Sequence, residues 1–287
     1  MQAVKKFFRS GEGYILVAPL LVGCLFFYAI PFVLVLRFSL FLGPTGNTAF
    51  VGLENYFRVL GNDMFRLAFG NTLKFLAIGL PLLMALAYLI ALLMKQQAGR
   101  HRVLKSVFMF PYIMPVVGTV MLVDLMFSEV GGLNNLLSLL QVPAAEWLSG
   151  PSAFWIVELL YLWKNTGYAV ILLLAGLVTI SEDQYSAADL DGASTFQKFL
   201  YITTPQMWYS VFFAVIFSLI NAFKCFREIF LIGGEHPNLN VYMLQHFLNN
   251  SFQSLNYAKL SVASVLLLIV VVLFFTIFYT FVRRKEV

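Results

Sequence analysis

The sequence predicts an all-α membrane protein, a polytopic bundle of six transmembrane helices with a short helical segment on the cytoplasmic side. Two observations carry this prediction. Hydrophobic residues make up 60% of the 287 residues and charged residues only 11%, whereas soluble domains carry about 25% charged residues. The apolar residues also gather in six long runs, each close to the roughly 20 residues that a membrane-spanning helix needs.

The six runs are continuous, which favours helices over the alternating strands of a membrane barrel. Prolines inside the runs, Pro81, Pro111 and Pro115, predict kinks. We expect residues 1–13 to form a cytoplasmic segment and residues 14–287 to form one six-span domain. The expected spans are Tyr14–Phe38, Leu73–Met94, Val103–Phe127, Phe154–Val178, Met207–Phe226 and Leu260–Val282.

The orientation follows from the lysines and arginines in the loops. Eleven of them flank the side that holds both termini, and five lie in the loops of the opposite side. Loops rich in Lys and Arg stay in the cytoplasm. The sequence therefore predicts that both termini are cytoplasmic, which agrees with an even number of spans.

Residues 181–206 form the one sizeable polar loop on the predicted cytoplasmic side. Ser-x-x-Gln patterns begin at Ser181 and at Ser194, and each predicts a capping box that starts a helix. Between them, Gly192 suits a turn with positive φ, and Pro205 ends the second helical piece. We expect two short helices joined by a glycine turn.

The charge of this loop favours a protein partner over lipid. Helices that lie on membranes usually carry Lys and Arg on their polar face. Here one basic residue, Lys198, stands against four acidic ones: Glu182, Asp183, Asp189 and Asp191. An interfacial helix is the alternative, and docking to a basic protein groove is the preferred interpretation.

The same segment resembles a known motif. It contains Ser186-Ala187-Ala188, then Gly192, then the run from Ile202 to Pro205. This spacing resembles the EAA loop of binding-protein-dependent ABC importer permeases, with Ser186 in place of the family's Glu and Thr204 in place of its Leu. The resemblance assigns coupling to an ATPase to Ser186, Ala187, Ala188, Asp189, Asp191, Gly192, Ile202 and Pro205.

The resemblance extends over residues 14–287. Further motifs typical of the carbohydrate-uptake type are Val51–Tyr56, Leu173–Leu177, Asn221–Lys224 and Gly233-Gly234. The resemblance implies the fold of a type I importer permease in a bacterial inner membrane. It also implies three kinds of partner: a second homologous permease subunit, two cytosolic ATP-binding subunits and an extracytoplasmic solute-binding protein.

Polar residues inside the fourth and fifth spans form two stripes at helical spacing. Polar groups within a membrane rarely face lipid and often mark a solute pathway. We expect solute contacts from Tyr161, Lys164, Asn165, Tyr168, Asn221 and Lys224. The alternative is pairing between helices, and it is preferred for Glu158 and Glu228, each with a lysine.

Several other functions are disfavoured. The sequence has no G-x-x-x-x-G-K-[ST] run, so it predicts no phosphate-binding loop. No catalytic arrangement is apparent, and the three histidines do not stand at metal-ligand spacing. We expect no enzyme activity, no cofactor, no metal and no nucleic-acid partner, with membrane lipid as the surroundings. Two rival classes stay open, an ion-coupled secondary transporter of a polar solute and a membrane scaffold.

Overall fold

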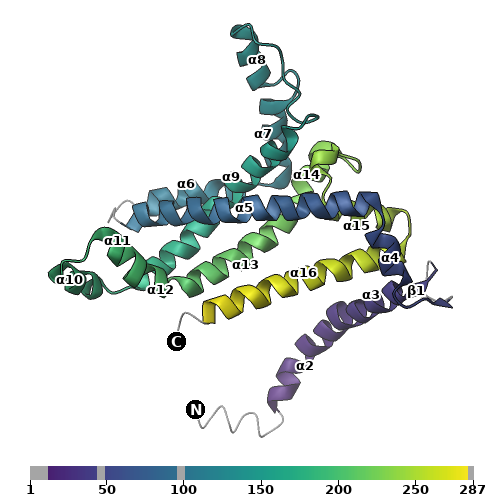
Figure 1. Ribbon diagram of the computed structural model, residues 1–287, viewed down its shortest axis with the longest axis horizontal. Helices are drawn as coiled ribbons and strands as arrows, with labels where there is room; N and C mark the ends of the chain where they lie inside the picture. The colour runs from purple at the N-terminus through teal and green to yellow at the C-terminus, as the bar shows by residue number, and fades with distance from the viewer. Residues whose placement is uncertain (1–11, 44–48, 96–100, 284–287) are drawn as a thin grey trace. The chain divides into compact units, whose positions relative to one another are not determined.

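The computed structural model describes residues 12–43, 49–95 and 101–283. These residues are helical over most of their length (Figure 1). They form two compact units. The first holds residues 12–62 and 248–270, and the second holds residues 63–247 and 271–283. The expected cytoplasmic segment 1–13 lies almost wholly outside the described residues.

The first unit begins with a long apolar helix. It runs without a gap through α2 (Glu12–Cys24), the π-helical turn η1 (Leu25–Ala29) and α3 (Ile30–Leu40). The wider turn comes immediately before Pro31, which occupies the start of α3. Because proline has no N–H and its ring clashes with the preceding turn, a local change of helical pitch accommodates it.

A short hairpin and one more helix follow in the first unit. β1 (Phe41–Leu42) pairs antiparallel with β2 (Ala49–Phe50), and α4 (Glu54–Leu60) comes next. Asn55 Nδ2 donates hydrogen bonds to the carbonyl oxygens of Ser39 and Phe41, each at 3.1 Å. These bonds fasten α4 to the end of α3.

The second unit is built from helices, several of which run side by side. Its elements begin with α5 (Asp63–Lys95), α6 (His101–Ile113), α7 (Val116–Phe127), α8 (Gly132–Leu139) and α9 (Ala153–Thr179). They continue with α10 (Glu182–Leu190), α11 (Thr195–Lys198), η2 (Phe199–Thr203), α12 (Thr204–Gln206), α13 (Trp208–Lys224), α14 (Phe226–Gly233) and η3 (Leu239–Val241). The last two described helices, α15 (Leu244–Gln253) and α16 (Tyr257–Arg283), each contribute residues to both units.

Among the described residues, six helical segments are long and apolar enough to cross a membrane, which confirms the predicted number. The second one begins at Asp63 rather than at Leu73, because helix α5 itself begins at Asp63. The segments are Leu16–Leu40, Asp63–Lys95, Val116–Leu139, Ala153–Thr179, Trp208–Gly233 and Tyr257–Thr280.

The third predicted span, Val103–Phe127, is wrong as a continuous helix. It is divided at Met114-Pro115 into α6 and α7. Pro115 has φ −58° and ψ 144° and forms the N-cap of α7. Proline lacks the N–H that a helix interior needs and disfavours a helical residue before it. Pro81, by contrast, lies inside the unbroken helix α5.

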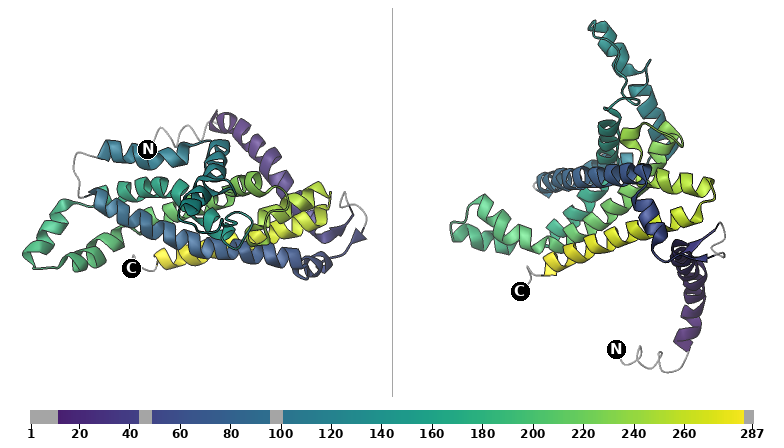
Figure 2. Two further views of the ribbon diagram at one scale, coloured as in Figure 1. Left: turned by 90° about the horizontal axis from the view of Figure 1, so that it is seen from above. Right: turned by 45° about the vertical axis from the view of Figure 1, so that its right-hand side comes forward.

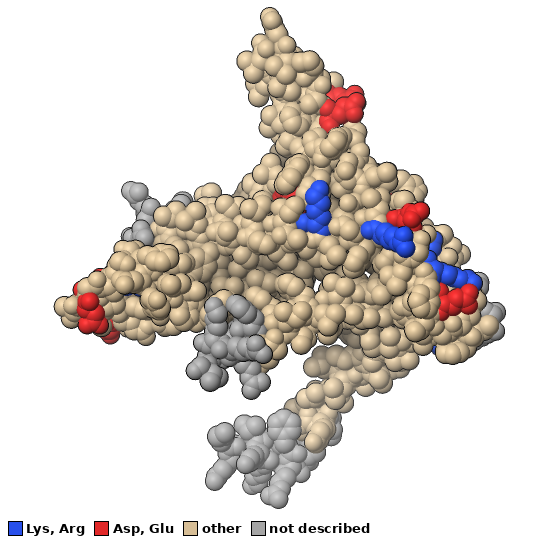
Figure 3. Space-filling model, viewed as in Figure 1, with Lys and Arg blue, Asp and Glu red and all other residues tan. Residues whose placement is uncertain are grey.

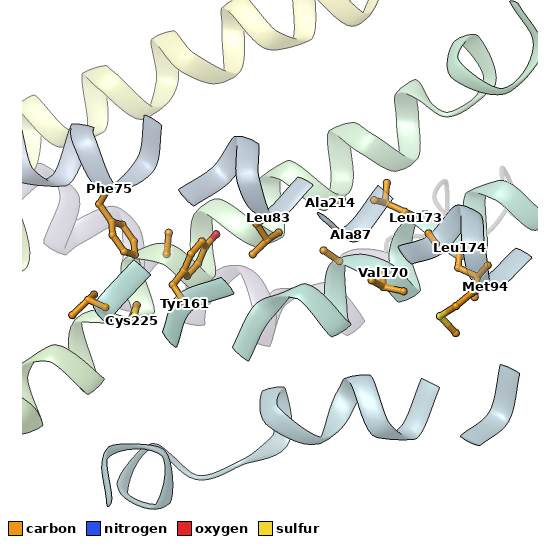
Figure 4. Close-up of a cluster of buried hydrophobic side chains, with 14 of the residues drawn as sticks. Phe75, Leu83, Ala87, Met94, Tyr161, Val170, Leu173, Leu174, Ala214 and Cys225 are labelled. Atoms are coloured by element: carbon orange, nitrogen blue, oxygen red, sulfur yellow. The ribbon is translucent and has the colours of Figure 1, made fainter. Parts of the chain in front are cut away.

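The core of the second unit lies between α5, α9 and α13. Small side chains such as Ala87 and Ala214 are fully buried there and let the helices approach closely. Figure 4 shows how the larger side chains fill the space between them. Its labelled residues are Phe75, Leu83, Ala87, Met94, Tyr161, Val170, Leu173, Leu174, Ala214 and Cys225.

One contact between α6 and α9 depends on the absence of a side chain. A Cβ atom added at Gly167 would lie 1.8 Å from the carbonyl oxygen of Phe108. Only glycine allows the two backbones to meet at this distance. Gly167 therefore permits the close approach of α6 to α9 at Phe108, six residues before the break at Met114-Pro115.

Candidate functional site

A cavity of about 290 Å³ lies where α9, α13 and α14 meet the break in the third span. It brings together four of the predicted solute-contacting residues, Lys164, Asn165, Asn221 and Lys224. The other lining residues are Tyr112, Met114, Pro115, Val116, Cys225, Arg227 and Glu228. The two polar stripes of the sequence thus face one space, and the broken helix closes its opposite side.

Two asparagines line the cavity although most of their surface is buried. The exposed fraction is 6% for Asn165 and 9% for Asn221. Asn165 Nδ2 donates to the carbonyl oxygen of Tyr161 at 2.9 Å, within its own helix. The Asn221 side chain forms no hydrogen bond with any other described residue. The Asn221 amide is therefore available to a molecule in the cavity.

One wall of the cavity carries a buried ion pair. Lys164 Nζ of α9 contacts Glu228 Oε1 of α14, and the two side chains are 14% and 5% exposed. The prediction that Glu228 pairs with a lysine is therefore confirmed. The pair neutralises one positive and one negative charge inside the bundle, where isolated charges are costly.

Two further cations line the cavity without such a partner. Lys224 and Arg227 are both exposed, and neither forms an ion pair within the described part of the chain. They flank Cys225, the residue at which α13 gives way to α14. Arg227 and Tyr112 line the cavity but were not among the predicted contacts. The break that brings Tyr112 to the cavity was indicated in the sequence by Pro115.

The two predicted tyrosines occupy different positions. Tyr161 is 1% exposed and its hydroxyl donates to the carbonyl oxygen of Ser218 at 2.9 Å. It does not line the cavity, because the bond to α13 turns it into the core. Tyr168 stacks on Tyr112, with ring centroids 4.8 Å apart, and so stands behind a residue of the cavity wall.

Glu158 lies in the core near Lys74, a cation that the sequence analysis did not single out. Its side chain is 2% exposed, and neither carboxylate oxygen has a hydrogen-bond partner. Lys74 of α5 acts on it electrostatically, but the ammonium lies 4.2 Å from the ring centroid of Phe154. The predicted ion pair between Glu158 and a lysine is not found among the described residues. Lys74 was missed because it sits at the start of an apolar run.

The segment 181–206 forms the two expected short helices, α10 and α11. Ser194 and Gln197 make the predicted capping box. The capping box predicted at Ser181 does not form. Ser181 Oγ accepts a hydrogen bond from the backbone N–H of Asp183 at 3.2 Å, and the Gln184 side chain accepts one from the Gln206 side chain instead. Figures 1 and 2 show α10 and α11 as a hairpin beyond the ends of α9 and α13.

The turn between these helices has the backbone that the sequence predicts. Gly192 has φ +76° and no heavy atom within 4 Å of an added Cβ. Across the turn, Lys198 Nζ of α11 pairs with Asp189 Oδ1 of α10 at 2.6 Å. The glycine and this ion pair together set the angle between the two helices.

Contacts at the base of the hairpin tie it to the membrane helices. Lys95, the last residue of α5, pairs with Glu182 at 3.2 Å and lies over the ring of Tyr185 at 4.2 Å. The Tyr185 hydroxyl in turn bonds to Thr203 Oγ1 at 2.9 Å. These contacts join α10 to the end of α5.

The far side of the hairpin is open. Leu190 is 91% exposed and Phe196 is 70% exposed, which is high for large apolar side chains. Figure 3 shows acidic side chains at the same end of the second unit. Among the motif residues, Ser186, Ala187, Asp189, Asp191, Gly192 and Pro205 are exposed, while Ala188 and Ile202 are half-buried.

Comparison with known sequences gives the family. The family described as "binding-protein-dependent transport system inner membrane component" matches residues 85–286. This chain belongs to that family. Membership of a family of transport-system membrane components speaks against the ion-coupled and scaffold alternatives.

Individual relatives of this permease are known over nearly its full length. The trehalose/maltose transport system permease protein MalF of Thermococcus litoralis is 32% identical and covers 97% of this chain and 96% of its own. The arabinooligosaccharides transport system permease protein AraP of Halalkalibacterium halodurans is 28% identical, with 95% and 89% covered. A bacterial ABC transporter that imports the acidic polysaccharide alginate has a chain of the same fold, with a TM-score of 0.83, 19% identity and 99% of both chains covered.

Proposed function

We propose that this permease forms, together with a second permease of the same family, the path by which a carbohydrate enters the cell. ATP hydrolysis on two partner subunits drives the transport, and an extracytoplasmic solute-binding protein delivers the solute. The relatives named for sugars, which include trehalose/maltose and arabinooligosaccharide permeases, support a carbohydrate. The chain itself has no phosphate-binding loop in its sequence and acts as a transport subunit rather than an enzyme.

The observation that carries this proposal is the cavity beside the broken third span. A sugar presents many hydroxyl groups, which need hydrogen-bond donors and acceptors inside an apolar bundle. Asn165 and Asn221 provide amides, and Asn221 has no competing partner among the described residues. The break at Pro115 adds backbone groups that an intact helix would consume. We assign solute contact to Lys164, Asn165, Asn221 and Lys224, with Tyr168 supporting the wall through Tyr112.

The hairpin of residues 181–206 is the proposed docking element for the ATPase. Its acidic surface suits a basic groove, and Leu190 and Phe196 offer the apolar contacts that such an interface needs. Movement of the docked hairpin reaches α5 through Lys95 and reaches α9 and α13 directly, because these helices enter and leave the hairpin. This connection would let nucleotide-driven closure alter the cavity.

We infer that both termini lie in the cytoplasm and that residues 14–287 act as one six-span domain. The distribution of Lys and Arg supports this orientation. A cytosolic reporter fused after Lys95 or Lys198 should read inside, and one fused after Glu146 or Asn240 should read outside. An inside reading at Asn240 would contradict the assignment of the fifth span.

Reconstitution tests the proposed function. The permease, its partner permease and the ATPase subunits are placed in proteoliposomes, and sugar uptake is measured with the solute-binding protein present. Uptake should require ATP, the binding protein and this chain, and it should disappear when any one of them is omitted. Uptake driven by an ion gradient in the absence of ATP would contradict the proposal.

A further inference from the structure

The cavity wall carries more positive than negative charge. It contains three cations, Lys164, Lys224 and Arg227, and one anion, Glu228. Since Lys164 is occupied by Glu228, the other two cations have no carboxylate facing them in the described part of the chain. Two uncompensated positive charges within membrane-spanning segments are costly unless a ligand or water meets them.

The opposite side of the cavity is also suited to an anion. Pro115 and Val116 of the wall are the N-cap and first residue of α7, a helix of 12 residues. The first N–H groups of a helix have no acceptor within the helix, and its N-terminus carries a partial positive charge. Asn221, which is 9% exposed and has no hydrogen bond among the described residues, lines the same space. Its amide is a second, independent indication that something polar binds here.

We propose that the cavity binds the anionic group of an acidic carbohydrate, such as a uronate, a sugar phosphate or a sulfated sugar. The anionic group lies between Lys224, Arg227 and the first turn of α7, and Asn165 and Asn221 hydrogen-bond to hydroxyls of the same sugar. This inference rests on the function proposed above and narrows its substrate class. The cavity volume of about 290 Å³ is at the lower end for ligand sites, so it holds a small solute or one end of a longer one.

An anionic lipid headgroup would offer the same chemistry, and the experiment has to separate the two sources. The assembled transporter is reconstituted in vesicles of pure phosphatidylcholine and, in parallel, in vesicles containing phosphatidylglycerol. Uptake is measured for matched probes: trigalacturonate against maltotriose, and glucose 6-phosphate against glucose. Lys224→Gln/Arg227→Gln is compared with Lys224→Arg/Arg227→Lys, which keeps both charges, and with Arg58→Gln, an exposed position on α4.

We expect an acidic probe to be taken up in both vesicle types and its neutral counterpart to be taken up poorly. In the Lys224→Gln/Arg227→Gln variant the half-saturating concentration should rise by about 10- to 100-fold, the range for losing hydrogen bonds to a charged group. Arg58→Gln should stay within about threefold of wild type, a loss smaller than that of one charged hydrogen bond. The charge-preserving variant should have a lower half-saturating concentration than the Gln/Gln variant, because both positive charges remain, but it serves as a comparison and not as an unaffected control.

Three results would overturn the inference. Uptake of an acidic probe that is equal in wild type and in the Gln/Gln variant would refute it and leave the proposed function intact. Loss of activity in pure phosphatidylcholine that the Gln/Gln variant does not show would assign the cations to a lipid headgroup. No ATP-dependent uptake of any probe, by a complex whose ATPase is active, would contradict the proposed function as well.

Discussion

Lys164 of α9 and Glu228 of α14 form an ion pair in the wall of the cavity, and both side chains are largely buried. The pair joins the central helix of the second unit to the helix that follows the fifth predicted span. The pair also leaves the cavity wall with a net positive charge, because Glu228 is the one acidic residue among the described lining residues.

Removing one partner of this pair should destabilise the protein more than removing both. Glu228→Gln leaves the Lys164 ammonium buried and unpaired, which we expect to lower the free energy of unfolding by about 3 kcal/mol. The double variant Lys164→Gln/Glu228→Gln removes both charges and should recover most of that loss. Thermal unfolding of the purified protein measures both effects. Equal stability of the single variant and wild type would show that the pair does not bear on the fold.

Gly167 tests the packing that positions the broken helix. Gly167→Ala puts a Cβ within 1.8 Å of the Phe108 carbonyl oxygen, so α6 and α9 must separate. We expect a loss of about 1–3 kcal/mol in the free energy of unfolding. Gly70→Ala in α5 is the matched control, because nothing lies within 4 Å of its added Cβ. If both variants unfold at the same temperature, the close approach at Gly167 is not a constraint.

The turn at Gly192 should matter for coupling and not for insertion. Gly192→Val places a β-branched residue at φ +76°, at a cost of about 1–3 kcal/mol of backbone strain. The angle between α10 and α11 should change, and the ATPase should no longer co-purify with the tagged permease. The amount of permease in the membrane should stay near that of wild type. Retention of both ATPase binding and uptake would exclude this hairpin as the coupling element.

A converse change probes the departure from the family motif. Ser186 is exposed on α10, and its Oγ donates to the Glu182 carbonyl oxygen at 3.1 Å. Ser186→Glu restores the family residue and adds one negative charge to the docking surface. We expect ATPase association to hold or tighten, as measured by co-purification. Loss of association would mean that the partner groove is adapted to serine.

Burial of His246 predicts a pH dependence of stability. His246 is fully buried beside Phe226 and accepts a hydrogen bond from the Met243 N–H at 3.1 Å. Desolvation by this burial lowers the pKa of His246 to about 4. Between pH 6.5 and about 4 the unfolded chain binds a proton that the folded chain does not. The free energy of unfolding should therefore fall by on the order of 3 kcal/mol as the pH drops through this window.

The control for this dependence is His246→Phe. Phenylalanine keeps an aromatic ring next to Phe226 and has no group that titrates. Melting temperatures at pH 7.5 and pH 5 should differ less in this variant than in wild type. A wild-type melting temperature that does not fall between these two pH values would contradict the assigned burial of the imidazole.

The sequence predicted the features that depend on local pattern. Long apolar runs predicted the six spans. Asp191-Gly192 between two serine caps predicted the hairpin and the positive φ of Gly192. The box at Ser181 failed because the partner of Gln184 is Gln206, a residue distant in sequence. Local spacing cannot anticipate a competing long-range bond.

The candidate site was also predicted only in part from local pattern. Helical periodicity placed Asn165 and Asn221 on polar stripes, and the structure brings these stripes to one cavity. Periodicity could not reveal that Tyr161 turns toward Ser218 in the core, since this depends on where α13 crosses α9. Nor could it reveal that the chain breaks fully at Met114-Pro115, because Pro81 and Pro111 lie in helices that continue.

The central claim is that the cavity lies on the transport path, and Asn221→Leu tests it most directly. Leucine has a similar size but cannot hydrogen-bond to a sugar. The measurement is ATP-dependent uptake by the reconstituted transporter, at equal amounts of permease and with Thr276→Val as the control. Thr276 is an exposed residue of α16 whose hydroxyl bonds within its own helix. We predict that Asn221→Leu lowers uptake by about 10-fold or more, the loss expected for a buried polar contact of the solute, while Thr276→Val transports like wild type. Wild-type uptake by Asn221→Leu would contradict the account.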